Sequence, residues 1–231
     1  MEIIRSILFY LFVALSFIFG TLLTVIIALF EKNQTKSFQR SAKIWAKLLA
    51  FLSGIPVSIE GDILKNEAFI LASNHQSYAD VLLLLAYLPA HFRFIIKKEL
   101  FKIPFFGWYL KKAGFISVDR GSSEKAHKLF SEAQDIIKSG ENILIFPEGT
   151  RSNDGQLQPF KRGALLLAFK SKVKVIPIAI SGSFNILPPK SLFFRVVPVK
   201  LKIGEPVSLE RFGSKFEEAA DYIHTQIKNM L

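Results

Sequence analysis

The N-terminal segment carries the longest apolar stretch of the chain. Between Ile3 and Phe30 the only charged residue is Arg5. A helix over this stretch would be about 42 Å long at ~1.5 Å per residue, more than the ~30 Å hydrocarbon core of a bilayer. The stretch is also too long for the apolar region of a cleaved signal peptide, and no small-residue cleavage site follows it before Glu31. The pattern predicts a membrane-embedded helix, either a tilted span or a helix held in one leaflet.

The next segment has two opposite stripes at helical spacing. One stripe is basic (Lys36, Arg40, Lys43 and Lys47) and the other is apolar (Phe38, Ala42, Trp45, Leu49 and Leu52). This pattern is typical of an interfacial helix whose basic face meets lipid headgroups. The alternative is a helix whose apolar stripe packs on a protein core. We assign residues 1–54 to a membrane-associated helical segment. If residues 3–30 span the bilayer, the basic cluster from Lys32 to Lys47 places the C-terminal domain in the cytoplasm.

After Gly54-Ile55-Pro56, short β-branched runs alternate with helical patterns. The runs predict strands at residues 57–60, 69–73, 92–97, 115–118, 143–146, 173–180 and 199–203. The helical patterns cover residues 80–88, 123–139, 160–170 and 214–230. Such alternation favours an α/β domain over residues 55–231, with a mostly parallel sheet flanked by helices and a site beyond the carboxyl ends of its strands.

Composition narrows the class of protein. Half of the 231 residues are hydrophobic, 23 of them Phe, and the formal net charge is +11. Such a surface suits anionic lipid or an acidic carrier protein. Nucleic acid is disfavoured because the N-terminal basic residues are interleaved with an apolar stripe. The chain has no cysteine, which excludes disulfides, thiolate metal sites and a Cys nucleophile.

A polar segment directly follows the predicted strand at residues 69–73. It reads Asn74-His75-Gln76-Ser77-Tyr78-Ala79-Asp80, so that His75 lies at a strand end and Asp80 at a helix start. At this boundary the carboxylate can face the imidazole, which it could not do on one continuous helix. His75 would be a general base for a hydroxyl proton, with Asp80 fixing its tautomer. The alternative is structural, because Ser77 and Asp80 also fit a capping box.

Two further motifs add to this candidate site. Phe146-Pro147-Glu148-Gly149-Thr150-Arg151-Ser152 follows another predicted strand and should lie at the same edge of the sheet. Its Gly149 permits close approach of backbone to a ligand, and the Arg151 guanidinium suits a phosphate. The stretch from Lys97 to Trp108 is cationic and then aromatic, so it could contribute charge to a phosphate pocket and apolar contacts to an acyl chain, or be ordinary surface and core. No spacing typical of metal ligands is present, so no metal is predicted.

Together these blocks resemble the glycerophospholipid acyltransferase family, and in particular the 1-acylglycerol-3-phosphate (lysophosphatidic acid) acyltransferases of bacteria. The resemblance covers residues 74–80, 97–108, 146–152 and 175–182, in that order. It implies that a fatty acyl group passes from an acyl thioester to the sn-2 hydroxyl of 1-acylglycerol 3-phosphate, giving phosphatidic acid. It also implies an N-terminal helical pair embedded in one leaflet.

The resemblance further implies a role for each site residue. His75 is the catalytic base and Asp80 its partner. Glu148, Gly149 and Thr150 belong to the acceptor site, and Arg151 binds the acceptor phosphate with help from Lys97. No cofactor and no acyl-enzyme are expected. The donor substrate is acyl-CoA or acyl-acyl carrier protein, and the site faces the cytoplasm at a membrane, the inner membrane in a bacterium.

Other functions stay open at this point. A related enzyme could acylate glycerol 3-phosphate or another lysophospholipid. A lipid hydrolase is disfavoured because no activated Ser is apparent. From a different class, the chain could be a non-catalytic membrane protein that binds anionic lipid through its positive charge.

Overall fold

The computed structural model describes residues 2–63, 67–118, 123–161, 165–188, 191 and 193–231. Within these residues, seven strands form one sheet: β1 (Val57–Glu60), β2 (Ile70–Ser73), β3 (Phe92–Lys97), β4 (Ile116–Val118), β5 (Asn142–Ile145), β6 (Val175–Ser181) and β7 (Val199–Ile203). The helices are α1 (Glu2–Ala28), α2 (Gln34–Ser53), α3 (Ala79–Tyr87), α4 (Phe106–Lys112), α5 (Ser123–Lys138), α6 (Leu166–Ser171) and α7 (Phe216–Met230). Three 3-10 turns are η1 (Lys98–Lys102), η2 (Ser183–Asn185) and η3 (Leu209–Phe212).

The sheet has the order β1-β7-β6-β2-β5-β3-β4. Every neighbouring pair is parallel except β6 and β7, which are antiparallel. The predicted fold class, a mostly parallel sheet flanked by helices, is therefore confirmed. Strands β2 and β5 lie next to each other near the centre, although β3 and β4 separate them along the chain.

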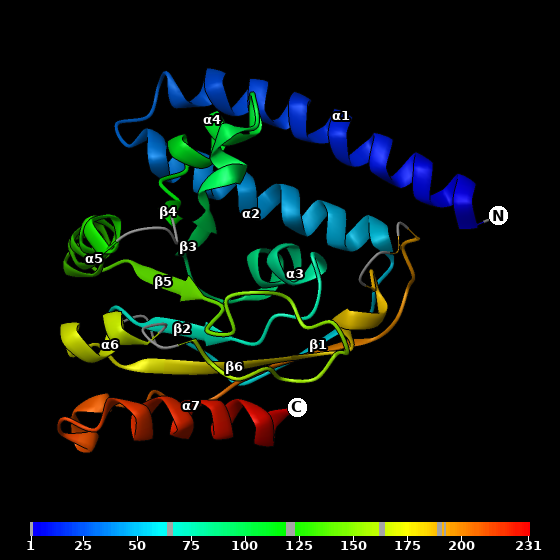
Figure 1. Cartoon of the computed structure of the whole chain (residues 1–231). Coiled ribbons are helices and arrows are strands. Elements are labelled where there is room, and N and C mark those ends of the chain that lie inside the picture. Colours follow the sequence, from blue (N-terminus) through cyan, green and yellow to red (C-terminus); the bar gives the residue numbers. More distant parts are fainter. Residues whose placement is uncertain (1, 64–66, 119–122, 162–164, 189–190, 192) are drawn as a thin grey trace.

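Alternate side chains of the central strands enter two separate cores, because successive residues of a strand point to opposite faces. Leu71 of β2 and Leu144 of β5 join the core beneath α2 and α3. Ile70 of β2 and Ile143 of β5 join the core beneath α5, α6 and α7. Figure 1 shows the resulting layers, with α1 to α4 on one side of the sheet and α7 on the other. Both faces are covered, as a parallel sheet requires.

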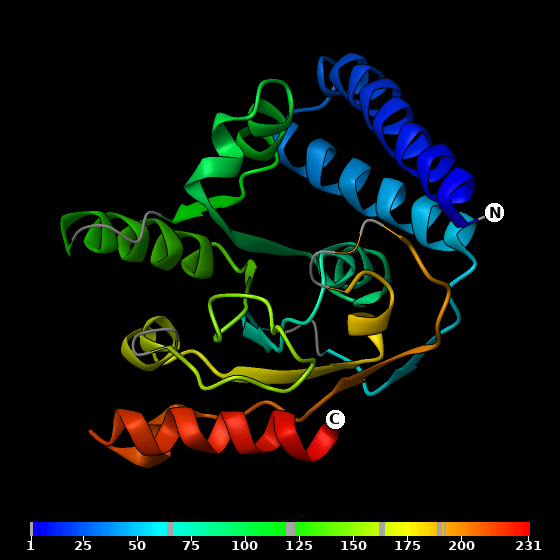
Figure 2. The same cartoon turned by 45° about the vertical axis from the view of Figure 1, so that its right-hand side comes forward.

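Helices α1 and α2 lie side by side on one face of the domain, which both views show (Figures 1 and 2). Trp45 Nε1 of α2 donates to Ser16 Oγ of α1 at 3.0 Å, and the ring of Phe17 packs edge-on against Trp45. Nearer the N-terminus, Phe9 stacks on Phe194 with 4.6 Å between ring centroids. Helix α1 thus contacts the rest of the chain along much of its length.

The predicted apolar stripe of α2 divides between two environments. Phe38, Ala42 and Leu49 are buried in the protein core, as the alternative interpretation of this helix expected, whereas Leu52 is exposed. The basic stripe also divides, because Lys43 turns inward and donates to the carbonyls of Leu88, at 2.8 Å, and Ala90, at 3.3 Å. Lys43 therefore ties the end of α3 to α2.

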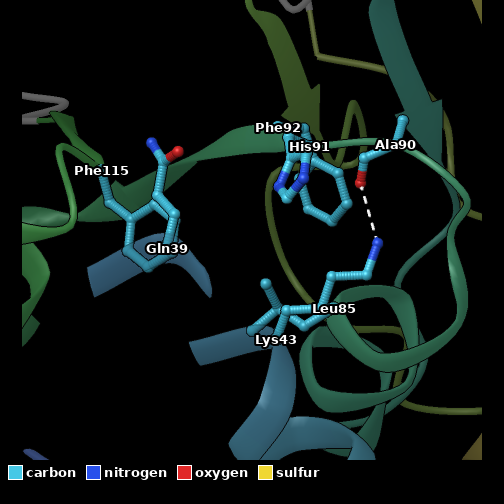
Figure 3. Close-up of a pocket in the computed structure, with 7 residues that line it drawn as sticks. All are labelled: Gln39, Lys43, Leu85, Ala90, His91, Phe92 and Phe115. Carbon is cyan, nitrogen blue, oxygen red and sulfur yellow. Dashed lines mark hydrogen bonds between the residues drawn. The ribbon is translucent and has the colours of Figure 1, made fainter. Parts of the chain in front are cut away.

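A pocket of about 10 Å³ lies beside this junction (Figure 3). Its lining residues are Gln39, Lys43, Leu85, Ala90, His91, Phe92 and Phe115. The volume admits about one water molecule and no substrate. Burial of the ring lowers the pKa of His91, and the positive charges of Lys43 and Arg40 lower it further.

One predicted helix is wrong in its extent. The pattern at residues 160–170 predicts a single helix, but α6 begins only at Leu166, and residues 162–164 lie outside the described part of the chain. Lys161 is not helical because its backbone N–H donates to the carbonyl of Pro147 at 2.9 Å. This bond ties the segment to the loop after β5. Helix α4 and the turn η1, in the stretch from Lys97 to Trp108, were not predicted.

Candidate active site

The two motif loops leave the sheet from neighbouring strand ends. Ala72 of β2 pairs with Ile145 of β5, so the loops at His75 and at Glu148 begin at the same level of the sheet. Asn74 anchors the first loop, since its side chain donates to the carbonyl of Ile180 at 2.9 Å and accepts from the Ile180 N–H at 2.8 Å. The expectation that both motifs lie at one edge of the sheet is confirmed.

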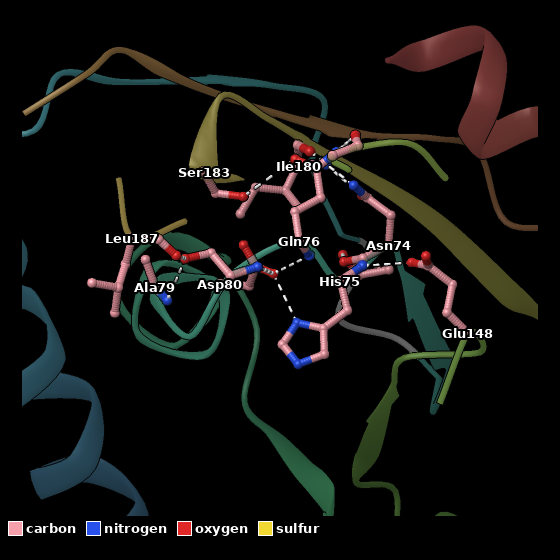
Figure 4. Close-up of polar contacts among 12 residues, drawn as sticks. Asn74, His75, Gln76, Ala79, Asp80, Glu148, Ile180, Ser183 and Leu187 are labelled. Atoms are coloured by element: carbon pink, nitrogen blue, oxygen red, sulfur yellow. Dashed lines mark hydrogen bonds and ion pairs between the residues drawn. The ribbon is translucent and has the colours of Figure 1, made fainter. Parts of the chain in front are cut away.

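His75 and Asp80 are in direct contact (Figure 4). Nδ1 of His75 lies 2.8 Å from Oδ2 of Asp80. The same oxygen accepts the backbone N–H groups of Gln76, at 2.7 Å, and Ser77, at 2.8 Å. Because a carboxylate only accepts hydrogen bonds, Nδ1 carries the proton and Nε2 is the imidazole nitrogen with a lone pair for a substrate proton.

The contact with His75 and helix capping coexist at this helix start. Asp80 lies in the first turn of α3 and accepts the Ser77 N–H, which is half of a capping box. The Asp80 side chain is fully buried, and within the described residues its Oδ1 has no hydrogen-bond partner. All the hydrogen bonds of this carboxylate thus fall on the oxygen that holds the imidazole.

Glu148 joins the two loops across the sheet edge. Its Oε1 accepts the backbone N–H of His75 at 2.6 Å, and its Oε2 accepts that of Gln158 at 2.8 Å. A parallel link runs from the Ser152 N–H to the carbonyl of His75 at 2.8 Å. The peptide groups on both sides of the His75 Cα are therefore held by the second loop.

The environment of Glu148 opposes its ionisation. The residue is 2% exposed. This burial raises the pKa of its carboxyl to about 7, against the two backbone hydrogen bonds, which lower the pKa. The negative charges of Asp80 and Asp154 raise it further. The link between the loops therefore contains a group that titrates near neutral pH.

The second loop turns sharply and leads to Arg151. Gly149 has φ of 71°, a left-handed conformation that favours glycine, and its N–H donates to the carbonyl of Phe146 at 2.9 Å. Thr150 beyond it is exposed. The Arg151 guanidinium lies over the ring of Tyr78, 3.5 Å from the ring centroid to Cζ. Tyr78 belongs to the first loop, so this stack is a further contact between the motifs.

The imidazole also has an aromatic support. The ring of Phe146 stacks on His75 with 4.0 Å between centroids and 15° between planes. Phe94 of β3 continues the stack, 6.1 Å from Phe146. Together with the Nδ1 contact, this stack fixes the orientation of the imidazole. The roles of Phe146, Tyr78 and Asn74 were missed in the sequence, where only their position inside the motifs marked them.

Lys97 lies apart from this network. It is the last residue of β3, at the same edge of the sheet, and its Nζ lies 3.8 Å from Glu99 Oε2 with the side chain 59% exposed. None of its described contacts joins it to His75 or Arg151. Within the described part of the chain, no group of three or more His, Asp or Glu residues could hold a metal ion.

Comparison with known proteins decides the family. A family model described as Acyltransferase matches residues 55–181, more than half of the chain and both motif loops. This chain belongs to the acyltransferase family. The acyltransferase fold extends beyond the matched region: the crystal structure of the 1-acyl-sn-glycerophosphate (LPA) acyltransferase from Thermotoga maritima aligns with a TM-score of 0.86 and 31% identity, over 99% of this chain and 95% of that one.

Curated acyltransferases of plants and bacteria are similar in sequence. The chloroplastic 1-acyl-sn-glycerol-3-phosphate acyltransferase of Brassica napus is 30% identical over 87% of this chain. The alignment spans 58% of that relative, and 54% of a chloroplastic one from Arabidopsis thaliana, so this chain matches little more than half of their length. The 1-acyl-sn-glycerol-3-phosphate acyltransferase of Helicobacter pylori is 33% identical over 74% of this chain and 72% of its own length.

Proposed function

We propose that this acyltransferase transfers a fatty acyl group from an acyl thioester to the free sn-2 hydroxyl of 1-acylglycerol 3-phosphate, giving phosphatidic acid. The observation that carries the proposal is the contact of His75 Nδ1 with a fully buried Asp80, which leaves Nε2 as the base, on a loop that also contacts Arg151 through Tyr78. A base beside a guanidinium suits an acceptor that carries a hydroxyl and a phosphate. The names of the relatives agree with this acceptor.

The reaction needs one base and no covalent enzyme intermediate. His75 Nε2 takes the hydroxyl proton while the acceptor oxygen attacks the thioester carbonyl carbon. Asp80 stabilises the imidazolium that forms. The tetrahedral intermediate then expels the thiolate, the C–S bond breaks, and the imidazolium returns the proton to sulfur. The ester oxygen replaces the thiol on the acyl carbon, so no redox cofactor is required.

Glu148 and Arg151 have separate parts in the proposal. Glu148 holds the His75 backbone, which keeps the base in register with the second loop. Arg151 binds the acceptor phosphate through the N–H groups of its planar guanidinium. Lys97, at the end of β3, adds a longer-range electrostatic attraction. Gly149 and Thr150 form the turn next to the bound acceptor. The donor is the thioester of coenzyme A or of acyl carrier protein, whose negative charge suits the net charge of +11.

An acceptor and donor panel tests the activity. The purified full chain is incubated with a labelled acyl-CoA or acyl-acyl carrier protein and with lysophosphatidic acid, glycerol 3-phosphate or another lysophospholipid, and the products are identified by mass. We expect phosphatidic acid, with turnover abolished in His75→Ala. If the wild-type chain binds these lipids but forms no acylated product, the result would instead indicate a non-catalytic lipid-binding protein.

Arg151→Ala tests the acceptor role on the same panel. Loss of a charged hydrogen-bonding partner should raise the KM for lysophosphatidic acid by about 10- to 100-fold, because a charge-assisted hydrogen bond contributes roughly 1.5–3 kcal/mol. The donor KM should stay close to the wild-type value. An unchanged acceptor KM would remove Arg151 from the phosphate site.

We further propose that α1 and α2 hold the domain on a membrane. Helix α1 is long and apolar enough to cross a bilayer by length and composition over Ser6–Ala28, and only 17% of that window is buried. Its contacts with Trp45 and Phe194, however, keep it along the domain. This supports embedding in one leaflet, with the exposed Lys36 and Lys47 of α2 among the headgroups on the cytoplasmic side.

Single cysteines distinguish the two membrane topologies, because the chain has none of its own. Glu2→Cys lies at the start of α1, and Lys32→Cys lies four residues after its end. In sealed vesicles carrying the full chain, embedding in one leaflet predicts that a membrane-impermeant maleimide labels both cysteines from the same side. Labelling of the two from opposite sides would establish a transmembrane helix.

A further inference from the structure

The contact between Tyr78 and Arg151 has no part in the proton chemistry. Tyr78 lies between His75 and Asp80 in sequence, yet the residue is 64% exposed instead of packing in the core. The Arg151 guanidinium lies over this ring, with Cζ 3.5 Å from the ring centroid. A guanidinium on the face of an aromatic ring is attracted by the ring quadrupole.

Stacking leaves the binding edge of the guanidinium available. The N–H groups of Arg point outward in the guanidinium plane, so a ring below that plane does not occupy them. Within the described residues Arg151 forms no ion pair with an acid, and the Tyr78 hydroxyl has no hydrogen-bond partner. The ring face, and not the hydroxyl, is therefore the part of Tyr78 that holds Arg151.

The stack also connects two functions that the sequence keeps far apart. Arg151 is on the loop after β5, whereas Tyr78 is two residues before Asp80, whose carboxylate holds the imidazole. A phosphate on Arg151 is thereby placed at a set separation from Nε2 of His75. An exposed Arg without this support would sample many rotamers, and binding would have to order it.

We propose that Tyr78 is a positioning residue for the acceptor phosphate. Its ring supports the Arg151 guanidinium and fixes the position of the guanidinium N–H groups relative to His75. This inference rests on the proposed role of Arg151. The loop that carries His75 then also contributes to acceptor selectivity, because only an acceptor with a phosphate binds more tightly to an ordered guanidinium.

The test is the kinetics of Tyr78→Leu and Tyr78→Phe with lysophosphatidic acid in mixed micelles. Tyr78→Leu should raise the acceptor KM about three- to ten-fold, in the range of a partly exposed cation–π contact, with kcat retained within about two-fold. Tyr78→Phe, which keeps the ring face, should restore the wild-type KM. The matched control is Tyr222→Leu, since Tyr222 carries a similar stack with Arg211, 4.1 Å from centroid to Cζ, on α7.

A double-mutant cycle separates this inference from the proposed function. If Tyr78 acts through Arg151, Tyr78→Leu should have no further effect on KM in an Arg151→Ala background. A raised KM in Arg151→Ala together with an unchanged KM in Tyr78→Leu would overturn the inference and keep the phosphate role. A lowered KM in Tyr78→Leu would also overturn it, because the ring would then hold Arg151 away from the phosphate. No change in Arg151→Ala would instead overturn the proposed function of Arg151.

Discussion

Asp80 and Arg151, one on each motif loop, are held in opposite ways. The Asp80 carboxylate is fully buried, and one of its oxygens accepts three N–H groups. The Arg151 guanidinium is partly exposed and rests on a single exposed ring. Several hydrogen bonds in the protein interior fix the carboxylate, whereas one solvent-exposed stack orients the guanidinium. In the proposed mechanism the site thus combines a rigid proton-transfer half, held by buried hydrogen bonds, with an anion-binding half that is held by a single exposed stack.

The largest effect should come from breaking the rigid half. Asp80→Asn keeps the shape of the side chain but removes the negative charge that stabilises the imidazolium and weakens the hydrogen bond that fixes its tautomer. We expect kcat to fall by about 10³- to 10⁴-fold with little change in acceptor KM. The measurement is steady-state turnover at saturating donor, with Asp221→Asn on the exposed side of α7 as the control. A loss below ten-fold would contradict the assigned pairing.

The Glu148 carboxyl, which links the two motif loops, should make the free energy of unfolding depend on pH. Between the ordinary pKa of 4.5 and the folded value of about 7, the unfolded chain has lost the Glu148 proton while the folded chain retains it. The folded state then binds more protons, so its stability falls as pH rises through this window and is level above it. The free energy of unfolding decreases by an amount of the order of 3 kcal/mol across this pH window.

This dependence is measured as a difference between two proteins. Glu148→Gln has no titrating group at this position, so the free energy of unfolding of the wild type relative to the variant should decrease from about pH 4.5 to about pH 7. Denaturant unfolding at several pH values gives the difference. A difference that stays constant with pH would contradict a raised pKa for Glu148.

The same substitution should also reduce activity, by less than the change at Asp80. A Gln side chain offers one acceptor atom and an NH₂ group that would face either the His75 or the Gln158 N–H. We expect kcat to fall by about 10- to 100-fold, the range of one lost charge-assisted hydrogen bond of roughly 1.5–3 kcal/mol. Glu67→Gln, at an exposed ion pair with Lys174, is the matched control. Wild-type turnover in Glu148→Gln would show that the two loops hold together without this carboxylate.

The smallest effect is expected at Lys97, which lies apart from the other site residues. Lys97 is mostly exposed, so its attraction for an anionic acceptor is screened by salt. Lys97→Ala should raise the acceptor KM by less than about three-fold, and added salt should remove the difference. An effect as large as that of Arg151→Ala would place Lys97 in direct contact with the phosphate.

Local pattern determined much of this protein. Short β-branched runs located the seven described strands to within two residues. The clearest runs are β2 and β6, because a strand buried on both faces is apolar throughout and ends where polar residues begin. The same reasoning placed His75 and the Glu148 to Arg151 loop at strand ends. Only the tertiary structure decided that β2 lies beside β5, which brings Glu148 to the backbone of a residue 73 positions away.

The support of the site was equally beyond local reasoning. Neither the stack of Phe146 on His75 nor that of Arg151 on Tyr78 follows from the spacing of residues along the chain. Each depends on the order of strands in the sheet, since side chains on different loops meet only when their strands are neighbours. The sequence by itself indicated which residues are candidates for the chemistry and at which strand ends they lie. Their mutual orientation was decided by strand order, because contacts between distant segments are selected by the packing of the whole sheet and its two cores.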